Sequence, residues 1–124
     1  MFADTKSFSA LAVDDLAAAR EFYGEILGIP GSEQHGMLTL NLAGGHYVRL
    51  YQTPNYAPAS STVLMFQVDD IGATVDELIS RGVQFERYDG MDTDERGITT
   101  GGGPFIAAWF KDPAGNTLEV LQER

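Results

Sequence analysis

Few residues in this chain are of types that readily perform chemistry. There is no cysteine, which excludes disulfides, thiolate metal ligands and a cysteine nucleophile. The two histidines, His35 and His46, lie in or beside expected turns. A histidine without neighbouring ligands makes a poor metal site, so we expect ordinary surface histidines at both positions. The remaining candidates are carboxylates, arginines and aromatic side chains, whose roles depend on the elements that carry them.

Composition narrows the range of partners. The chain has 124 residues and a formal net charge of -10, which suits one domain over residues 1–124. Such acidity argues against binding nucleic acid or an anionic membrane, because both are bound through lysine and arginine. It is compatible with a cationic ligand, and equally with a surface charged only for solubility. No signal peptide or membrane span is evident, and the absence of cysteine fits the cytoplasm.

The first half, about residues 5–54, shows one helix pattern among strand patterns. Asp14 and Asp15 can cap the helix, and Gly28 can end it. Apolar residues recur at helical spacing between these points. The expected strands are residues 7–13, 37–42 and 46–52, with Gly44 and Gly45 as the turn between the last two.

The second half, about residues 60–124, repeats this order after a proline-containing link at residues 51–61. Asp69 and Asp70 provide the cap, and Gly82 ends the helix. The expected strands are residues 62–68, 83–88, 105–111 and 117–122, with a turn at residues 112–116. Residues 89–103 form a long, acidic, glycine-rich loop, which is typical of a functional lid or of a solvated mobile segment.

The two halves match at both ends. Val13-Asp14-Asp15-Leu16 resembles Val68-Asp69-Asp70-Ile71, and residues 45–52 align with residues 115–122. A repeat found in two places is better support for duplication than one coincidence. Each half therefore reads as a strand, a helix and three strands.

The opening and closing motifs resemble the vicinal oxygen chelate superfamily, which includes glyoxalase I, extradiol dioxygenases and bleomycin-resistance proteins. The opening motif spans Phe8 to Leu16 and continues with Phe22-Tyr23 and Leu27-Gly28. The closing motif is Asp112-Pro113-Ala114-Gly115-Asn116 followed by Leu118-Glu119. The resemblance implies an α+β fold: two βαβββ modules forming a curved, cup-shaped mixed sheet with helices outside. It also implies a homodimer.

The resemblance further implies where a metal would be held. Metal-dependent members take ligands from the first and last strands of each module, and these places hold Phe8, Arg49, Val63 and Glu119 here. Only Glu119 can ligate a divalent cation, whereas a catalytic site needs about three protein ligands. Arg49 would add a fixed positive charge. We therefore expect no metal and no cofactor.

Strand alternation extends this set to a cleft face. A one-residue error in register would invert it. The expected ligand-binding residues are Phe8, Tyr47, Arg49, Tyr51, Met65, Gln67, Phe105, Trp109 and Glu119. Apolar walls with a few polar groups are typical of a small-molecule pocket, although such aromatic residues could also fill the cup as a second core. Arg49 and Glu119 could pair as a salt bridge, or they could hold a ligand carboxylate and amine.

These observations favour a metal-independent small-molecule-binding protein of the bleomycin-resistance type, which would sequester an aromatic or cationic compound. Such a role would suit antibiotic resistance. The alternative is an enzyme on the same scaffold, either a glyoxalase-like lyase or isomerase or a dioxygenase relative, with Glu119 as catalytic base or metal ligand. An accessory module without a ligand is the third hypothesis.

Overall fold

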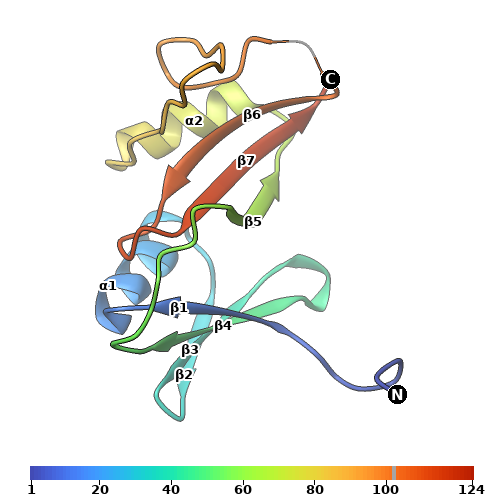
Figure 1. Cartoon of the computed structure of the whole chain (residues 1–124), viewed down its shortest axis with the longest axis vertical. Coiled ribbons are helices and arrows are strands. Elements are labelled where there is room, and N and C mark those ends of the chain that lie inside the picture. Colours follow the sequence, from blue (N-terminus) through green and yellow to red (C-terminus); the bar gives the residue numbers. More distant parts are fainter. Residues whose placement is uncertain (102) are drawn as a thin grey trace. The chain divides into compact units, whose positions relative to one another are not determined.

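Two sequence-contiguous units make up the chain, Met1–Ala57 and Pro58–Arg124, and each is described by itself. The computed structural model describes residues 1–101 and 103–124. The expected loop 89–103 thus includes one residue, 102, that lies outside the described residues. Each unit has α+β architecture with one mixed sheet, four-stranded in the first and three-stranded in the second (Figure 1). The α+β expectation is confirmed.

The first unit has the expected order of strand, helix and three strands. Its strands are β1 (Ser9–Val13), β2 (Gly31–Gln34), β3 (Met37–Asn41) and β4 (Tyr47–Gln52), arranged in the order β1-β4-β3-β2. The β1–β4 pair is parallel and the other pairs are antiparallel. The helix α1 (Leu16–Arg20) continues into a π-helical turn, η1 (Glu21–Ile26), and a 3₁₀ turn, η2 (Ala43–Gly45), precedes β4.

One face of this sheet is buried by its helix. The buried strand residues alternate along β3 and β4, and Phe22 and Tyr23 of η1 are buried with them. The expected period of two is therefore confirmed. The opposite face carries Tyr47, Arg49 and Tyr51, as predicted, because Val48 and Leu50 occupy the buried face.

Strand β2 is one of the three strands expected after the helix, but no residue range was predicted for it. It pairs with β3 through a two-residue turn, His35-Gly36, in which both residues have positive φ. Such left-handed pairs are typical of tight hairpins, and this dipeptide was the available signal.

The second unit contains β5 (Thr62–Gln67), α2 (Ile71–Ser80), β6 (Phe105–Lys111) and β7 (Thr117–Glu123), with strand order β5-β7-β6. The β5–β7 pair is parallel and the β6–β7 pair is antiparallel. Helix α2 buries Ile71, Val75 and Leu78 and contacts β6 and β7.

The predicted strand at residues 83–88 is wrong. Only Phe85 bridges to Phe110 of β6, and the Glu86 amide donates to the Trp109 carbonyl at 2.7 Å. The next position along β6 is taken by Thr99, whose amide donates to the Ala107 carbonyl at 2.9 Å. Two short segments thus share the strand edge that one strand was expected to cover.

The two units repeat one contact at the start of their helices. The Gln52 side chain accepts from the Leu16 amide at 2.9 Å, and the Gln122 side chain accepts from the Ile71 amide at 2.8 Å. Asp15 and Asp70 cap the same helices by accepting from amides three residues on. The duplication seen in the sequence therefore extends to equivalent hydrogen bonds.

Candidate functional site

The second unit contains a hollow of about 450 Å³ beside the sheet. Strands β6 and β7 supply Phe105, Ala107, Trp109 and Glu119, and the loop before β6 supplies Met91 and Asp92 together with glycines. Phe105 is 46% exposed, so an aromatic surface remains open. This volume lies within the range of small-molecule sites.

Glu119 and Trp109 are directly opposite each other on β7 and β6. The Trp109 indole N–H donates to Glu119 Oε1 at 2.8 Å, and the Thr62 hydroxyl lies 3.3 Å from the same oxygen. Glu119 is 8% exposed. Both of these contacts use Oε1. Among the described residues no fully buried side-chain oxygen lacks a partner, so Oε2 keeps some contact with solvent, and Glu119 is one of the residues that line the hollow.

Thr62 is a contact that the sequence interpretation missed. Val63 was expected on the face of Glu119, but the β5–β7 register shifts between Thr62 and Leu64. This irregularity turns the Thr62 hydroxyl toward Trp109 and Glu119. After this irregularity, Met65 and Gln67 lie on the same face as Glu119, as predicted, since Met65 pairs with Glu119 and Gln67 with Leu121.

Tyr88 adds a second aromatic ring beside Trp109. Their ring centroids are 5.9 Å apart and the planes are inclined at 78°, an edge-to-face arrangement. Burial, followed by the charge of Glu86, raises the pKa of the Tyr88 phenol. The phenol is therefore neutral at physiological pH and can donate a hydrogen bond.

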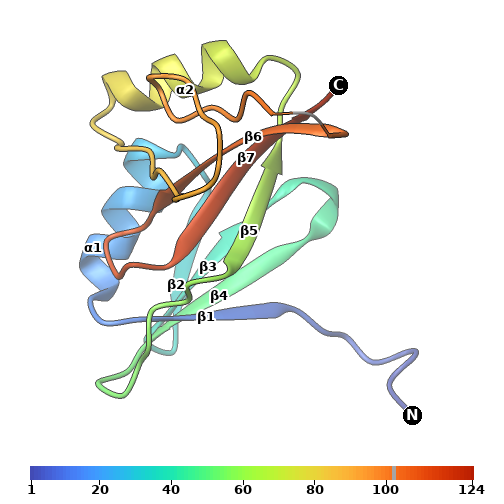
Figure 2. The ribbon, with the colours of Figure 1, turned by 45° about the horizontal axis from the view of Figure 1, so that its top comes forward.

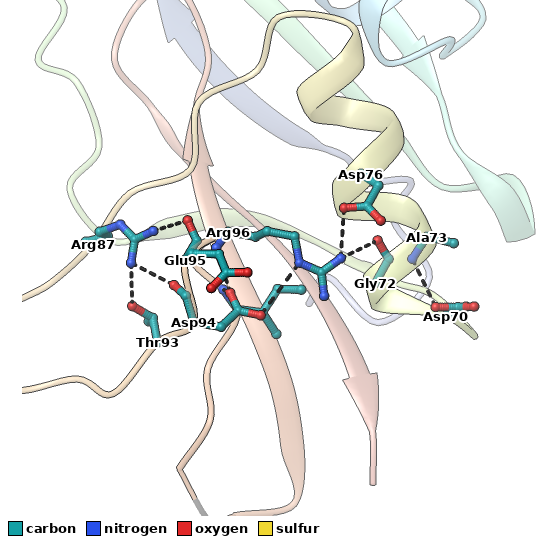
Figure 3. Close-up of polar contacts among 10 residues, drawn as sticks. Asp70, Gly72, Ala73, Asp76, Arg87, Thr93, Asp94, Glu95 and Arg96 are labelled. Carbon is teal, nitrogen blue, oxygen red and sulfur yellow. Dashed lines mark hydrogen bonds and ion pairs between the residues drawn. The ribbon is translucent and has the colours of Figure 1, made fainter.

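The loop that forms one wall of the hollow is fastened to the second unit. Arg87 donates to the Asp94 and Glu95 carbonyls, and Arg96 donates to Asp76 of α2 at 2.8 Å (Figure 3). The same loop lies beside α2 in both ribbon views (Figure 2). These contacts show how residues 92–99 are held, and the lid expected for residues 89–103 stays a prediction.

The first unit gathers a different set of predicted residues. Phe8, which precedes β1 rather than lying within it, stacks on Tyr47 with centroids 5.0 Å apart and planes at 24°. The Arg49 guanidinium carbon lies 4.5 Å from the Phe8 centroid. The Lys6 ammonium lies 5.5 Å from the Tyr47 centroid, a contact that was not foreseen. Tyr51, 41% exposed, shares this face.

The residues at the superfamily's metal-ligand places do not suit a metal. In the first unit they are a phenyl ring and a guanidinium, which lie against each other. In the second unit they are Val63 and a carboxylate that already accepts an indole N–H. Among residues 1–101 and 103–124 there is no group of three histidine or acidic side chains able to hold a metal ion. Nor does any helix in those ranges have the length and apolarity to cross a membrane.

Comparison with known proteins decides the family. The model of the Glyoxalase/Bleomycin resistance protein/Dioxygenase superfamily matches residues 7–120. The chain belongs to this superfamily. None of the curated protein sequences matches it significantly.

Solved structures show the same superfamily fold. A glyoxalase family protein from Bacillus anthracis is 20% identical, with all of both chains covered and a TM-score of 0.72. TnmS3, an antibiotic binding protein from Streptomyces sp. CB03234, is 25% identical over 98% of each chain, with a TM-score of 0.69. The fosfomycin resistance protein FosX from Listeria monocytogenes is 17% identical over 98% of this chain and 94% of its own, with a TM-score of 0.69.

Proposed function

We propose that this superfamily member binds and sequesters a small aromatic cation without a metal, and that the hollow beside Trp109 and Glu119 is its binding site. The observation that carries the proposal is the pairing of aromatic surface with negative charge. Trp109 and Phe105 provide ring faces, Glu119 and Asp92 provide carboxylates, and no lysine, arginine or histidine is among the described residues that line the hollow. Aromatic faces and carboxylates both attract a planar cation.

The similarity to TnmS3 supports the class of function, because that protein is an antibiotic binding protein. The other residues predicted on the cleft face, including Met65 and Gln67, belong to this proposal as further ligand contacts. Phe8, Tyr47, Arg49 and Tyr51 of the first unit stay predicted ligand-binding residues, and the proposal for the hollow does not require them. The homodimer and the cytoplasmic location also stay predictions, and light scattering on the purified protein tests the former.

Trp109 makes the proposal easy to test, because it is the only tryptophan in the chain. Proflavine, a planar aromatic cation, should quench Trp109 emission with a saturable curve, and the neutral analogue acridone should bind more weakly. Calorimetry should show that Glu119→Gln weakens proflavine binding about tenfold, the effect of losing one charged contact. Glu77→Gln, which removes an equal charge on α2, is the matched control and should bind normally.

Two results would contradict the proposal. Equal binding of proflavine and acridone would show that charge plays no role in the hollow. Loss of proflavine binding after treatment with a chelator, together with stoichiometric metal in untagged protein, would show that binding depends on a metal.

The accessible Oε2 atom of Glu119 favours a second candidate, a lyase or isomerase in which this carboxylate removes a proton from the substrate. Glu119→Gln distinguishes the two functions. A sequestering protein would retain weakened binding in this variant, whereas an enzyme would lose turnover while still binding its substrate.

A further inference from the structure

The first unit has an unusual distribution of positive charge. Its sequence contains six acidic residues and three basic ones, Lys6, Arg20 and Arg49. Arg20 is paired with Glu33. The other two basic side chains both lie over the stacked rings of Phe8 and Tyr47. In this acidic unit, the two cations that have no ion pair with another described residue are therefore both found at one aromatic pair.

Arg49 has its hydrogen-bond donors free within the described residues of its own unit, where its guanidinium contacts rings rather than a carboxylate or carbonyl. Contact with the faces of two rings holds the guanidinium without using its N–H groups. A guanidinium held in this way is prepared to donate two parallel hydrogen bonds to one planar anion.

The residues beside Arg49 in the sheet have short side chains. Across the sheet, Arg49 lies between Ala10 of β1 and Thr39 of β3, both small residues. Tyr51, two residues along β4, adds an exposed ring on the same face. The surface thus combines short neighbouring side chains, exposed aromatic rings and a cation.

We propose that Lys6, Phe8, Tyr47 and Arg49 form a binding site for a small aromatic anion, such as an aryl carboxylate, with Arg49 holding the anionic group and the rings contacting the aromatic part. This site is chemically opposite to the hollow beside Trp109, which carries carboxylates. The inference does not depend on the hollow binding any ligand.

The probe for the test is 2-naphthoate, with neutral 2-naphthylmethanol as its control. In a titration of the whole chain followed by NMR, 2-naphthoate should shift the Arg49 Nε–Hε signal and the amide signals of Phe8 and Tyr47. Calorimetry should show affinity falling about tenfold in Arg49→Met, as for loss of a charged hydrogen bond. Affinity should also fall as ionic strength rises.

Matched variants separate this site from a general charge effect. Arg20→Met removes the same charge from the same unit but lies away from the rings, so it should bind 2-naphthoate like the unaltered chain. Arg49→Lys should recover only part of the affinity, because a lysine ammonium cannot donate the parallel pair of hydrogen bonds. Proflavine quenching of Trp109 should persist in Arg49→Met, so failure here is distinguishable from failure of the proposed function.

Three outcomes would overturn the inference. Equal binding of 2-naphthoate and 2-naphthylmethanol would show that no anion is recognised. An equal loss of affinity in Arg20→Met and Arg49→Met would show that 2-naphthoate responds only to the net charge of the unit. Tighter 2-naphthoate binding in Glu119→Gln would show that Arg49 already has a carboxylate partner in the folded chain.

Discussion

Asp94 offers a test of how the wall of the hollow is held. Its Oδ1 atom accepts from the Arg96 amide at 2.8 Å and from the Ile98 amide at 3.0 Å. Ile98 is 6% exposed, so these bonds fasten the loop where it enters the core. The loop on either side supplies Met91, Asp92 and Thr99 to the hollow. Asp94 itself does not line it, so its substitution tests anchoring rather than ligand contact.

We expect Asp94→Ala to lower the free energy of unfolding by about 2 kcal/mol, because it removes two hydrogen bonds at about 1 kcal/mol each. Asp94→Asn keeps a side-chain oxygen that can accept both bonds but loses the negative charge beside Arg96, so it should lose about half as much. Urea denaturation followed by Trp109 fluorescence measures both values. In the folded protein, Asp94→Ala should also weaken proflavine binding, since the wall is less firmly positioned.

The pH dependence of stability tests the contribution of the Asp94 charge. Burial by itself would raise the pKa of Asp94, but hydrogen bonds from the Ile98 and Arg96 amides and the charge of Arg96 outweigh it and lower the pKa. In the unfolded chain the pKa of Asp94 is about 3.9, so the stabilisation is fully present above that pH and is lost as the pH falls through the lower pKa of the folded protein. The gap in stability between the unaltered chain and Asp94→Asn should therefore narrow in acid.

A matched control for this measurement is Asp89→Asn, whose carboxylate has no hydrogen bond to other described residues. It should leave stability unchanged at neutral pH. The reasoning is refuted if the gap between the unaltered chain and Asp94→Asn is the same at neutral and acid pH, or if Asp89→Asn destabilises as much.

Four other substitutions test the packing of the units. Gly97→Ala should destabilise the second unit by about 1–3 kcal/mol in urea denaturation, since its backbone is left-handed and a Cβ atom would lie 2.9 Å from Phe85 Cβ. Asn116→Ala should lower the free energy of unfolding by about 3 kcal/mol, because Asn116 is 1% exposed and bonds to Asp112 and to the Ala59 amide. Gln52→Ala and Gln122→Ala should each cost about 1 kcal/mol in thermal denaturation, and unequal losses would contradict the equivalence of their helix contacts.

The elements that could be predicted were those whose pattern is local. Alternation placed β3, β4, β6 and β7 within a residue or two, and the aspartate caps and glycine stops bounded both helices. The sequence could not show that residues 83–88 do not form a strand. Part of the β6 edge that they were expected to cover is bound instead by Thr99, which comes later in the chain. The π-helical turn within the first helix likewise leaves the apolar spacing almost unchanged.

The part of the candidate site that lies on regular strands was predictable, because alternation assigns each strand residue to one face. Trp109 and Glu119 were placed together by counting along β6 and β7, and their hydrogen bond confirms that register. Thr62 was missed because a bulge shifts β5 by one residue without a sequence signal. Lys6 and Tyr88 were missed because their ring contacts depend on how segments outside the regular strands return to the sheet.

Arg49 and Glu119 occupy equivalent positions in the last strands of the two sheets, yet their surroundings differ in kind. Arg49 is held by ring faces, which attract a cation, and Glu119 accepts from an indole N–H, which attracts an anion. In each unit the aromatic residue beside the charge therefore stabilises it without neutralising it. A metal site would need both positions to supply electron pairs, and a guanidinium can supply none. The pattern instead leaves one positive and one negative group available, each with an aromatic surface beside it, which is the chemistry required to select flat ligands by charge.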